Sequence, residues 1–527
     1  MTDDFDIAVI GGGINGAGIA RDAALRGLKV ALFEKSDFGS GTSSWSSRLI
    51  HGGLRYLEYG EIPLVFESLR ERRLLRELAP HLVDGLSISI PVYRGSRRGL
   101  TMIRLGMITY DLLSLGKKLP RHRMLNRDEM IAAEPQLLSD GLVGGARYFD
   151  SQVTYAERLV LENIIAAHEA GAVVRNYSPV IGINVKRSAV EGLHYLDHAT
   201  GKEQEIRARV IINAAGPWVD RVLATVNREL PTFMGGTKGS HIVVGSFKGA
   251  PTSAYYVEAA EDGRPFFIIP WNSQLLIGTT DIRYDGDPGE VRASEEEIRY
   301  LLDETNRVFP SARLTRDSIH YAYSGVRPLP KRSKGPAAAI TRKHIIHRHR
   351  REASGLVSII GGKLTTYRNL AEQAVDTTLR LLGRTRTACL TRTLPLPGAV
   401  GLAEAEADIR AALMPDCASR LLAIYGSRAA RILDVHRQLT SETFLDDNRT
   451  VLAAEVVHAM RDEFAIDLVD VVHRRLMTGL GADQGRSIAK ATALWAQKEA
   501  GWSDRETARQ LRTLEDYNRS MRPVKPE

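Results

Sequence analysis

A glycine-rich turn near the start of the chain most constrains what it can fold into. Residues 7–10 are an apolar run typical of a buried parallel strand, and Gly11, Gly13 and Gly16 follow with the spacing G-x-G-x-x-G before a helical stretch. A second apolar run then ends at Glu34. The glycines let a pyrophosphate approach the backbone, and an acid after the second strand can accept hydrogen bonds from ribose hydroxyls. This order of elements predicts a dinucleotide-binding unit.

Length and composition limit the remaining possibilities. A chain of 527 residues is too long for one compact domain, and its 43% hydrophobic and 25% charged residues are typical of a soluble globular protein. The two cysteines, Cys389 and Cys417, lack metal-site spacing and favour a reducing compartment. The N-terminus has no basic region, so we expect no cleaved signal peptide, and no uncharged apolar run reaches the roughly 18 residues that a membrane span needs. We therefore expect a protein in the cytoplasm or on the cytoplasmic face of the membrane.

The net charge of +8 favours anionic partners in general, among them a phosphorylated substrate, acidic lipid and nucleic acid. No zinc-finger spacing or RNA-binding signature occurs in the sequence. We therefore do not expect nucleic acid to be a partner.

Two later segments are expected to return to the first sheet. An apolar run at residues 210–213 leads into the small residues 214–216, and another at 356–360 leads into a Gly-Gly turn. Stretches of alternating or β-branched character predict an antiparallel sheet in a separate substrate domain, at residues 87–93, 241–244, 266–269 and 275–278.

A polar segment at residues 42–56 follows soon after the expected ribose-binding acid. It is rich in small hydroxyl residues and glycines, which permit close backbone contact with a flat cofactor. A flexible serine-rich linker is the alternative, but the run His51-Gly-Gly-Leu-Arg-Tyr56 has a more specific chemistry than a linker needs. NAD and FAD share the glycine turn, so that turn alone does not choose between them.

Several motifs together resemble those of the aerobic, FAD-dependent glycerol-3-phosphate dehydrogenases. They occur in the order of that family between about residues 5 and 380, and the broader fold is similar to the glycine oxidase and D-amino-acid oxidase group. The resemblance rests on residues 11–20, 42–56, 213–218, 238–243, 277–281, 323–329 and 361–368.

The resemblance implies an α/β fold in which a Rossmann-like FAD-binding domain is interleaved with a mixed or antiparallel β-sheet substrate domain, followed by an all-α C-terminal domain. The oxidoreductase region is expected over residues 1–390 and the helical domain over 391–527. We expect a linker at residues 394–398 and a disordered tail from Met521. The FAD-binding segments are expected at about 1–75, 150–230 and 340–390, and the substrate-domain segments at about 76–149 and 231–339.

The resemblance also implies oxidation of sn-glycerol 3-phosphate to dihydroxyacetone phosphate, with electrons passing through FAD to a membrane quinone. A phosphate dianion needs charge-assisted donors. The expected substrate-binding residues are Arg55, Tyr56, Lys363 and Thr366, with Arg327 as a further cation; Lys363 could instead stabilise the reduced flavin. The expected cofactor-binding residues are Gly11, Gly13, Gly16, Glu34, Thr42, Ser43, Ser47, Ala215, Gly216, Gly361, Gly362 and Thr365.

The substrate hydroxyl must lose a proton, and histidine suits the role of a base near neutral pH. His51 and His241 both lie in the matched motifs and are the catalytic candidates, and either could instead be structural. Arg327 could stabilise the developing alkoxide. The histidines at 344, 347 and 349 alternate with basic residues, which favours an exposed basic hairpin over a metal site, and we expect no metal.

Residues 94–123 contain basic residues around an apolar centre, the pattern of an interfacial membrane anchor. A core helix with a basic rim is the alternative. A peripheral protein on the inner face of the cell membrane fits the expected quinone acceptor. The competing functions are a soluble oxidase that uses oxygen, an amine or amino-acid oxidase, and a non-enzymatic flavin-binding protein. The C-terminal domain could form a homodimer, cover the active site or contact the membrane.

Overall fold

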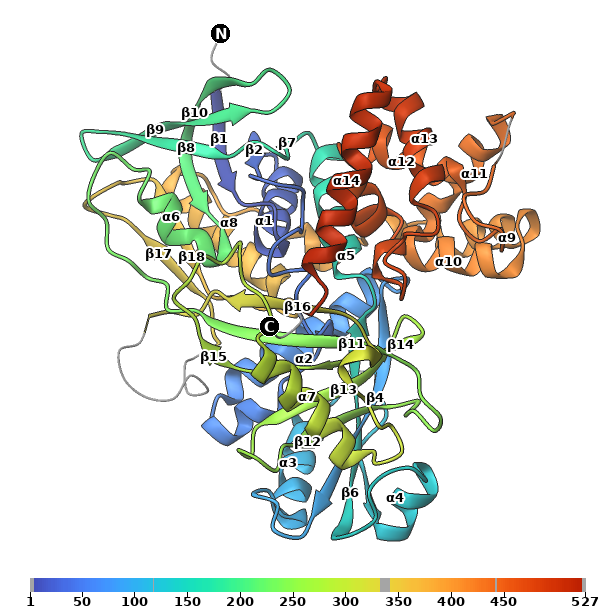
Figure 1. Ribbon diagram of the computed structural model, residues 1–527. Coiled ribbons are helices and arrows are strands. Elements are labelled where there is room, and N and C mark those ends of the chain that lie inside the picture. Colours follow the sequence, from blue (N-terminus) through green and yellow to red (C-terminus); the bar gives the residue numbers. More distant parts are fainter. Residues whose placement is uncertain (1–3, 117, 332–341, 441–442, 524–527) are drawn as a thin grey trace.

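The computed structural model describes residues 4–116, 118–331, 342–440 and 443–523. Figure 1 shows two β-sheets, one above the other, with the C-terminal helices grouped beside the upper sheet. The chain passes between the two sheets several times, so each sheet is built from segments that are far apart in the sequence. The fold is therefore the predicted α/β fold with an interleaved second sheet and a helical C-terminal part.

The first sheet has a parallel centre in the order β18-β10-β1-β2-β7. Strand β17 pairs antiparallel with β18, and the hairpin β8–β9 continues from β10. The predicted strands at residues 210–213 and 356–360 are confirmed, since they lie in β10 and β18. Among the described residues the sheet has eight strands, with the bounds β1 (Asp4–Ile10), β2 (Val30–Phe33), β7 (Val173–Arg175), β8 (Val180–Lys186), β9 (Ala189–Asp197), β10 (Lys202–Asn213), β17 (Ile345–Arg348) and β18 (Leu356–Ile360).

Strand β1 is apolar throughout because both of its faces are covered. Successive side chains of a strand point to opposite faces. Ile7 and Val9 pack with the helices on one face, and Ala8 and Ile10 pack with β8, β9 and the short helix α6 on the other. The helices of the first sheet are α1 (Ile14–Leu25), α5 (Ala156–Glu169), α6 (Val219–Leu223) and α8 (Tyr367–Leu381).

The second sheet follows the order β15-β11-β14-β13-β12-β4-β6-β3, with β16 on β11 and β5 on β6. Its pairs are antiparallel except for β12 with β4. All four stretches that predicted an antiparallel sheet lie in it, within β4, β11, β13 and β14. Within the described residues it has ten strands, with the bounds β3 (Leu49–Ile50), β4 (Val83–Tyr93), β5 (Arg123–Asn126), β6 (Leu142–Val153), β11 (Thr237–Gly245), β12 (Ala254–Glu258), β13 (Pro265–Trp271), β14 (Gln274–Gly278), β15 (Ile282–Arg283) and β16 (Ile319–Arg327).

Helices cover both faces of the second sheet. Ile242 and Val244 of β11 pack with α7, and Val243 belongs to the cluster that includes side chains of α2 and α3. Figure 1 shows α7 in front of the sheet, with α2 and α3 behind it. The helices of this part are α2 (Ile62–Leu78), α3 (Leu100–Leu113), α4 (Arg127–Ala133) and α7 (Glu295–Val308), and a 3-10 helix, η1, covers Leu54–Tyr59.

The C-terminal part is fixed to the first sheet by buried ion pairs. Arg158 of α5 lies 2.6 Å from Glu463, and Arg475 lies 2.7 Å from Asp37, which follows β2. Such pairs have a well-defined geometry because their charges must stay partnered away from water. The helices are α9 (Leu402–Ala412), α10 (Pro415–Tyr425), α11 (Ala429–Gln438), α12 (Ala453–Asp462), α13 (Ala489–Ala500) and α14 (Asp504–Ser520).

The segments expected to be a linker and a disordered tail are packed against the rest of the molecule where the structure describes them. The expected linker at residues 394–398 packs against α1, where Arg21 donates to the carbonyl of Leu394 (2.7 Å) and Leu396 is buried. The expected disordered tail begins with a buried Met521, whose carbonyl oxygen accepts from Ala322 N at 2.7 Å. Residues 524–527 of that tail lie outside the described residues.

Candidate active site

A cavity of about 1120 Å³ lies where the two sheets meet. It is large enough for an elongated dinucleotide and a small substrate, and Arg474 and Tyr517 of the C-terminal part also line it. The structure brings most of the candidate residues to its wall. They are Gly11, Gly13, Glu34, Thr42, Ser43, Ser47, His51, Arg55, Tyr56, Ala215, Gly216, His241, Arg327, Gly362, Lys363 and Thr365.

The glycine turn brings the start of α1 to one end of the cavity. A Cβ atom at Gly16 would overlap the carbonyl oxygen of Gly11, so α1 can lie this close to the end of β1 only with glycine at position 16. Gly13 caps the helix with an extended backbone. The free N–H groups of a helix start are a binding site for phosphate.

Glu34 closes this turn from the end of β2. Its Oε2 accepts from Gly12 N at 2.7 Å and its Oε1 accepts from Ser36 N at 2.9 Å. Burial raises the pKa of Glu34, while the two N–H donors lower it, and the net shift is upward. Each carboxylate oxygen can accept more than one hydrogen bond, so Glu34 keeps the capacity to bind a ribose hydroxyl.

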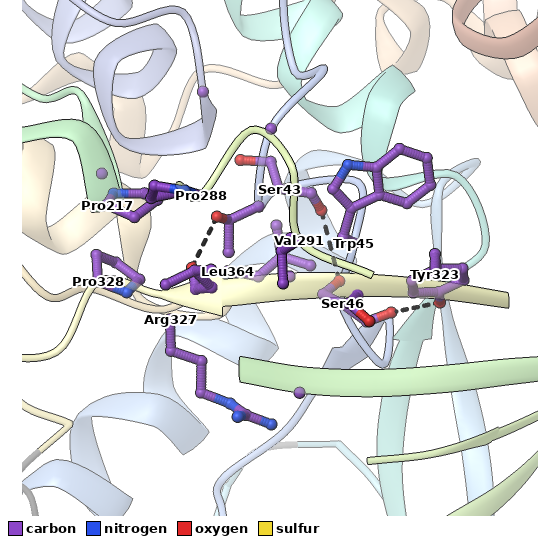
Figure 2. Close-up of a pocket in the computed structure, with 18 of the residues that line it drawn as sticks. Ser43, Trp45, Ser46, Pro217, Pro288, Val291, Tyr323, Arg327, Pro328 and Leu364 are labelled. Atoms are coloured by element: carbon purple, nitrogen blue, oxygen red, sulfur yellow. Dashed lines mark hydrogen bonds between the residues drawn. The ribbon is translucent and has the colours of Figure 1, made fainter. Parts of the chain in front are cut away.

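The polar segment after β2 joins the two sheets. Thr42 donates to a carbonyl of β16 (2.9 Å), and Ser43 accepts from the first amide of α1 (3.0 Å). Figure 2 shows this segment beside β16, where the hydroxyl of Tyr323 donates to the carbonyl of Ser46 at 2.8 Å. The segment is therefore an ordered part of the cavity wall, and the linker alternative is wrong.

Two further turns meet the glycine turn at the same edge of the first sheet. Ala215 and Gly216 follow β10, and Gly362 and Thr365 follow β18. Carboxyl ends of parallel strands are the usual place for a nucleotide. Thr365 Oγ1 accepts from the amide of His51 (3.2 Å), which connects this edge to the second sheet.

Positive side chains gather at the other end of the cavity. Arg55 comes from η1, Arg327 from the end of β16, and Arg342 and Lys363 from segments beside β17 and β18. Figure 2 shows Arg327 projecting from the end of β16. Asp281 is the carboxylate among them, 3.1 Å from Arg327 and 3.3 Å from Arg342. Although burial raises the pKa of Asp281, the two arginines lower it overall.

Arg327 and Lys363 are partly buried in the wall of the cavity. Arg327 donates to Thr279 Oγ1 and the Thr280 carbonyl at 3.1 and 3.0 Å, and burial lowers its pKa to about 10 in spite of Asp281. Lys363 Nζ lies 3.7 Å from the ring centre of Tyr56 and is buried without a hydrogen-bond partner among the described residues. Burial lowers the pKa of Lys363, while Tyr56 raises it. These cations are positioned to receive an anion.

His241 faces the cavity from β11. Its Nε2 lies 2.8 Å from Ser47 Oγ, and its ring stacks on Tyr323 with the ring centres 4.9 Å apart. Its Nδ1 is buried with no partner in the described part of the chain. Burial lowers the pKa of His241 to about 3, and Arg327 and Arg48 lower it further. The imidazole is therefore neutral near pH 7.

His51 follows β3 on the opposite wall. Burial lowers its pKa to about 4; Asp150 opposes the shift, and Lys363 and Arg72 add to it. Its ring meets that of Phe267 edge to face, with the centres 6.4 Å apart. Both candidate bases are thus neutral at physiological pH, and the same burial makes each a weaker base than a free imidazole.

Several residues of the site were not predicted from the sequence. Arg342 and Asp281 complete the charged end, and Arg48 is fully buried, with both terminal nitrogens 2.7 Å from Glu157. Asp281 lies within a motif that carried the resemblance, so its acidic side chain was a usable signal. Arg342 had none, because a single arginine in a basic stretch is more often solvated.

Three predicted residues do not line the cavity. Gly16 lies beneath the turn, and Gly361 accepts from Asn15 Nδ2 through its carbonyl (3.3 Å). Both support the nucleotide end indirectly. Thr366 is buried directly before α8 and does not reach the cavity wall, which corrects its expected role as a donor to the substrate.

The expected basic hairpin is only partly exposed. Residues 345–348 form β17 as predicted for a hairpin, but His344 and His349 are buried. His349 Nε2 lies 2.9 Å from Ser358 Oγ and His344 Nε2 lies 3.2 Å from Gln373 Oε1, so packing explains both. Within the described residues, no group of three or more histidine, cysteine, aspartate or glutamate side chains could hold a metal ion.

Comparisons with known proteins agree with this geometry. Residues 6–368 match the family of FAD dependent oxidoreductases, and residues 389–507 match the C-terminal domain of alpha-glycerophosphate oxidase. A glycerol-3-phosphate dehydrogenase of Synechocystis sp. is 46% identical over 97% of this chain and 96% of its own length. An aerobic glycerol-3-phosphate dehydrogenase of Staphylococcus aureus is 35% identical over 90% of this chain and 86% of its own.

Solved structures show the same likeness. The glycerol-3-phosphate dehydrogenase of Bacillus halodurans, complexed with FAD, superposes with a TM-score of 0.81 at 29% identity, covering 100% of this chain and 97% of that one. The glycine oxidase of Geobacillus kaustophilus shares the fold of the oxidoreductase region, with a TM-score of 0.55 at 22% identity over 75% of this chain and 99% of that one.

Proposed function

The chain belongs to the family of FAD-dependent glycerol-3-phosphate dehydrogenases, and from that premise we propose that it oxidises sn-glycerol 3-phosphate to dihydroxyacetone phosphate. The observation that carries the proposal is the cluster of Arg55, Arg327, Arg342 and Lys363 in the same cavity as two neutral histidines. A phosphorylated alcohol needs both an anion site and a base. An amine or amino-acid oxidase does not need phosphate-binding cations, so the cluster disfavours that alternative.

The residues at the nucleotide end fit FAD. The start of α1 can bind the pyrophosphate, Glu34 can accept from the ribose, and the hydroxyls of Thr42, Ser43 and Ser47 line the way toward the second sheet. Gly216 and Gly362 allow close approach at the edge of the first sheet. When bound, FAD supplies the two-electron acceptor of the reaction.

The cations would hold the phosphate of the substrate. Arginine presents two N–H groups in one plane and matches a phosphate with two parallel hydrogen bonds. Lys363 Nζ, buried with no hydrogen-bond partner among the described residues, adds a point charge. Binding an anion here compensates charges that are costly to bury alone. For the reaction, the alcohol carbon of the bound substrate would then face one of the two histidines.

A neutral histidine would take the hydroxyl proton. In the tautomer with its proton on Nδ1, Nε2 of His241 carries the free lone pair, 2.8 Å from Ser47 Oγ, and is the nitrogen that would accept that proton. His51 is the other candidate, and Arg327 can stabilise the alkoxide as it forms.

Rapid mixing of the oxidised enzyme with substrate under anaerobic conditions tests this assignment. We expect His51→Ala or His241→Ala to slow flavin bleaching by roughly 100-fold or more. His320→Ala is the control, because His320 lies on β16 but does not line the cavity. If both cavity variants reduce the flavin at the wild-type rate, neither histidine is the base.

The reaction itself is tested in the same apparatus. Glycerol 3-phosphate is expected to bleach the flavin of the wild-type enzyme, and glycerol at the same concentration is expected to leave it oxidised, because it offers nothing to the cations. A flavin that stays oxidised with glycerol 3-phosphate would contradict the proposed function and leave a non-enzymatic flavin protein as the better interpretation.

We further propose a quinone as the electron acceptor. A second candidate is an oxidase that uses oxygen, which the match of residues 389–507 to the C-terminal domain of alpha-glycerophosphate oxidase favours. The two differ in what the reduced enzyme does next. A quinone-linked enzyme is reoxidised rapidly by a soluble quinone analogue and forms little hydrogen peroxide in air, whereas an oxidase forms peroxide in step with substrate use.

The quinone proposal is supported by an apolar surface on α3. Met102, Leu105, Ile108 and Leu112 lie on one side of this helix and each exposes more than half of its surface. Tyr59, Ile62 and Phe66 of the neighbouring η1 and α2 are also exposed. In the part of the chain that the structure describes, no helix is both long enough and apolar enough to cross a bilayer. We propose that this surface places the protein on the membrane from its cytoplasmic side.

Cations surround the apolar surface of α3. Arg94, Arg97, Arg104, Lys118 and Arg121 are exposed nearby, and a rim of this charge attracts anionic lipid. Three residues of the expected anchor segment 94–123 do not contribute: Ile103 and Met107 are buried in the core, and Arg98 is buried in ion pairs with Glu58 and Glu258. Lys117 lies outside the described residues.

Sedimentation with anionic phospholipid vesicles tests the surface. Ile108→Glu and Leu105→Glu are expected to release most of the protein, because a charge on the apolar side opposes insertion. Leu494→Glu is the matched control, since Leu494 is an equally exposed leucine on α13. Binding that is insensitive to salt and unchanged in both α3 variants would rule this surface out.

A further inference from the structure

Three buried polar side chains meet behind the His51 turn and belong to none of the binding groups described above. Tyr110 donates to Asp150 Oδ2 at 2.6 Å, and Arg72 donates to Asp150 Oδ1 and to the carbonyl of Phe149 (3.1 Å). Tyr110, Asp150 and Arg72 expose at most 2% of their surfaces. We call these three residues the Tyr110 cluster.

The Tyr110 cluster is bound to one backbone amide of the site. Gly52 N donates to the hydroxyl of Tyr110 at 2.9 Å and lies 3.3 Å from Asp150 Oδ1. A Cβ at Gly52 would overlap the Tyr110 hydroxyl and lie 2.6 Å from a methyl of Leu69. The backbone at Gly52 is thus pressed against the cluster as closely as a glycine allows.

The position of Gly52 in the chain makes this contact important. His51 precedes it, and Gly53 follows with a positive φ of 77° before η1, which carries Arg55 and Tyr56 into the cavity. On its other side the segment is held by the hydrogen bond from the His51 amide to Thr365. A single turn therefore places a candidate base and two substrate-binding residues, and it is held where it begins by two successive backbone amides.

The chemistry of a phenol suits the contact. The hydroxyl of Tyr110 donates to the carboxylate and accepts from the Gly52 amide at the same time, which phenylalanine cannot do. Burial and the nearby Asp150 raise the pKa of Tyr110 well above its ordinary value, so the hydroxyl keeps its proton. Arg72 compensates the buried charge of Asp150. Two atoms of the cluster, the Tyr110 hydroxyl and Asp150 Oδ1, thus accept from the same backbone amide, that of Gly52.

We propose that Tyr110 and Asp150 are positioning residues of the reaction, which hold the segment His51–Tyr56 in its productive place without touching substrate or cofactor. The proposal rests on the proposed oxidation of glycerol 3-phosphate. It holds whichever histidine is the base, because the same turn also positions Arg55 and Tyr56.

The helix that supplies Tyr110 has a second role in the molecule. Tyr110, Met107 and Ile103 form the buried side of α3, while Leu105 and Ile108 lie on the exposed side described above. The tests are therefore made in vesicle-free solution, where the membrane surface has no influence on the result.

The main test is Tyr110→Phe in the FAD-loaded enzyme. The ring can keep its edge-to-face contact with Tyr148, 5.7 Å between centres, and only the hydroxyl is lost. Amide hydrogen exchange of the peptide that contains Gly52 is expected to become about 10-fold faster or more, since this N–H loses its closer acceptor. Flavin reduction by glycerol 3-phosphate is expected to slow by roughly 10- to 100-fold, because a small misplacement of reacting groups has a large effect on rate.

Tyr300→Phe is the matched control. Tyr300 also donates to an aspartate, Asp262 at 3.1 Å, but on α7 and away from the cavity. It should leave both readouts unchanged. Asp150→Asn is the second variant, and it is expected to speed Gly52 exchange and slow reduction in the same direction as Tyr110→Phe.

Two outcomes overturn the proposal. If Tyr110→Phe reduces its flavin at the wild-type rate, the cluster has no positioning role, whether or not Gly52 exchanges faster. If reduction slows while Gly52 exchange and flavin content stay unchanged, the hydroxyl acts in some other way than by holding this turn. Failure of the proposed function is recognised separately, because the wild-type enzyme itself would then remain oxidised with glycerol 3-phosphate.

Discussion

The two ends of the cavity are built in different ways. At the nucleotide end, β1, the glycine turn, α1 and β2 come from one stretch of about thirty residues, and the contacts are largely made by backbone groups. At the substrate end, Arg55, Arg327, Arg342 and Lys363 come from segments up to three hundred residues apart. There the contacts are made by charged side chains.

The two ends also differ in how well their polar groups are partnered in the absence of a ligand. The nucleotide end is already hydrogen-bonded within itself, since Glu34 accepts from the amides of Gly12 and Ser36. The substrate end holds more positive than negative charge in a buried place, and Lys363 Nζ has no hydrogen-bond partner in the described residues. Buried charge without a partner is costly. A site that keeps it is prepared for an anion.

Gly16→Ala should have the largest effect, because it prevents α1 from packing at the end of β1, where the nucleotide end of the cavity is formed. The added Cβ would overlap the carbonyl oxygen of Gly11, so α1 has to move away from β1. We expect purified protein with essentially no bound flavin, measured by its visible absorbance. Gly106→Ala is the control, since a Cβ there meets nothing closer than 3.9 Å. Normal flavin content in Gly16→Ala would mean that this turn does not shape the cofactor site.

Arg327→Ala should have the next largest effect and should act only at the substrate end. Loss of a buried charge-assisted donor is expected to lower kcat/KM for glycerol 3-phosphate by roughly 1000-fold, about 4 kcal/mol. Flavin content should stay normal, because Asp281 keeps Arg342 as a partner. Arg384→Ala, which removes an exposed ion pair with Asp6, is the control. Loss of flavin from Arg327→Ala would show that the two ends are not independent.

The same difference explains how much the sequence could predict. The nucleotide end was predictable from local pattern, since spacing of glycines, strands and an acid determines backbone shape. The His51 and Arg327 motifs were found by their resemblance to a family, and only folding brings them together. Arg342 and the Tyr110 cluster could not be identified from the sequence. An arginine in a basic stretch has the same sequence pattern whether it is solvated or part of a site, and a tyrosine on an apolar helix has the same pattern whether it only packs or also positions a turn.

Lys363 offers a test of the substrate end through pH. Burial lowers its pKa, so its charge is lost at a lower pH than that of an ordinary lysine. Affinity for glycerol 3-phosphate should therefore weaken by about 10-fold as the pH rises toward the ordinary lysine value. Lys363→Arg should move this loss to higher pH, because the ordinary pKa of a guanidinium is higher than that of an ammonium group. The dissociation constant is obtained over pH 7 to 10 from the dependence of the anaerobic flavin reduction rate on substrate concentration. An identical profile in both proteins would exclude Lys363 as the titrating group.

Glu34→Gln should have the smallest effect, and it tests whether the nucleotide end is as robust as its backbone contacts indicate. The amide keeps one acceptor oxygen for Gly12 or Ser36, and the other FAD contacts remain, so we expect FAD to bind about 5-fold more weakly. Because burial raises the pKa of Glu34, the wild-type protein should also lose FAD affinity on acidification before an ordinary carboxyl group would protonate, and the variant should lack this loss. Glu406→Gln on α9 is the surface control. A loss of flavin as complete as in Gly16→Ala would mean that a side chain, and not the backbone, determines this end of the cavity.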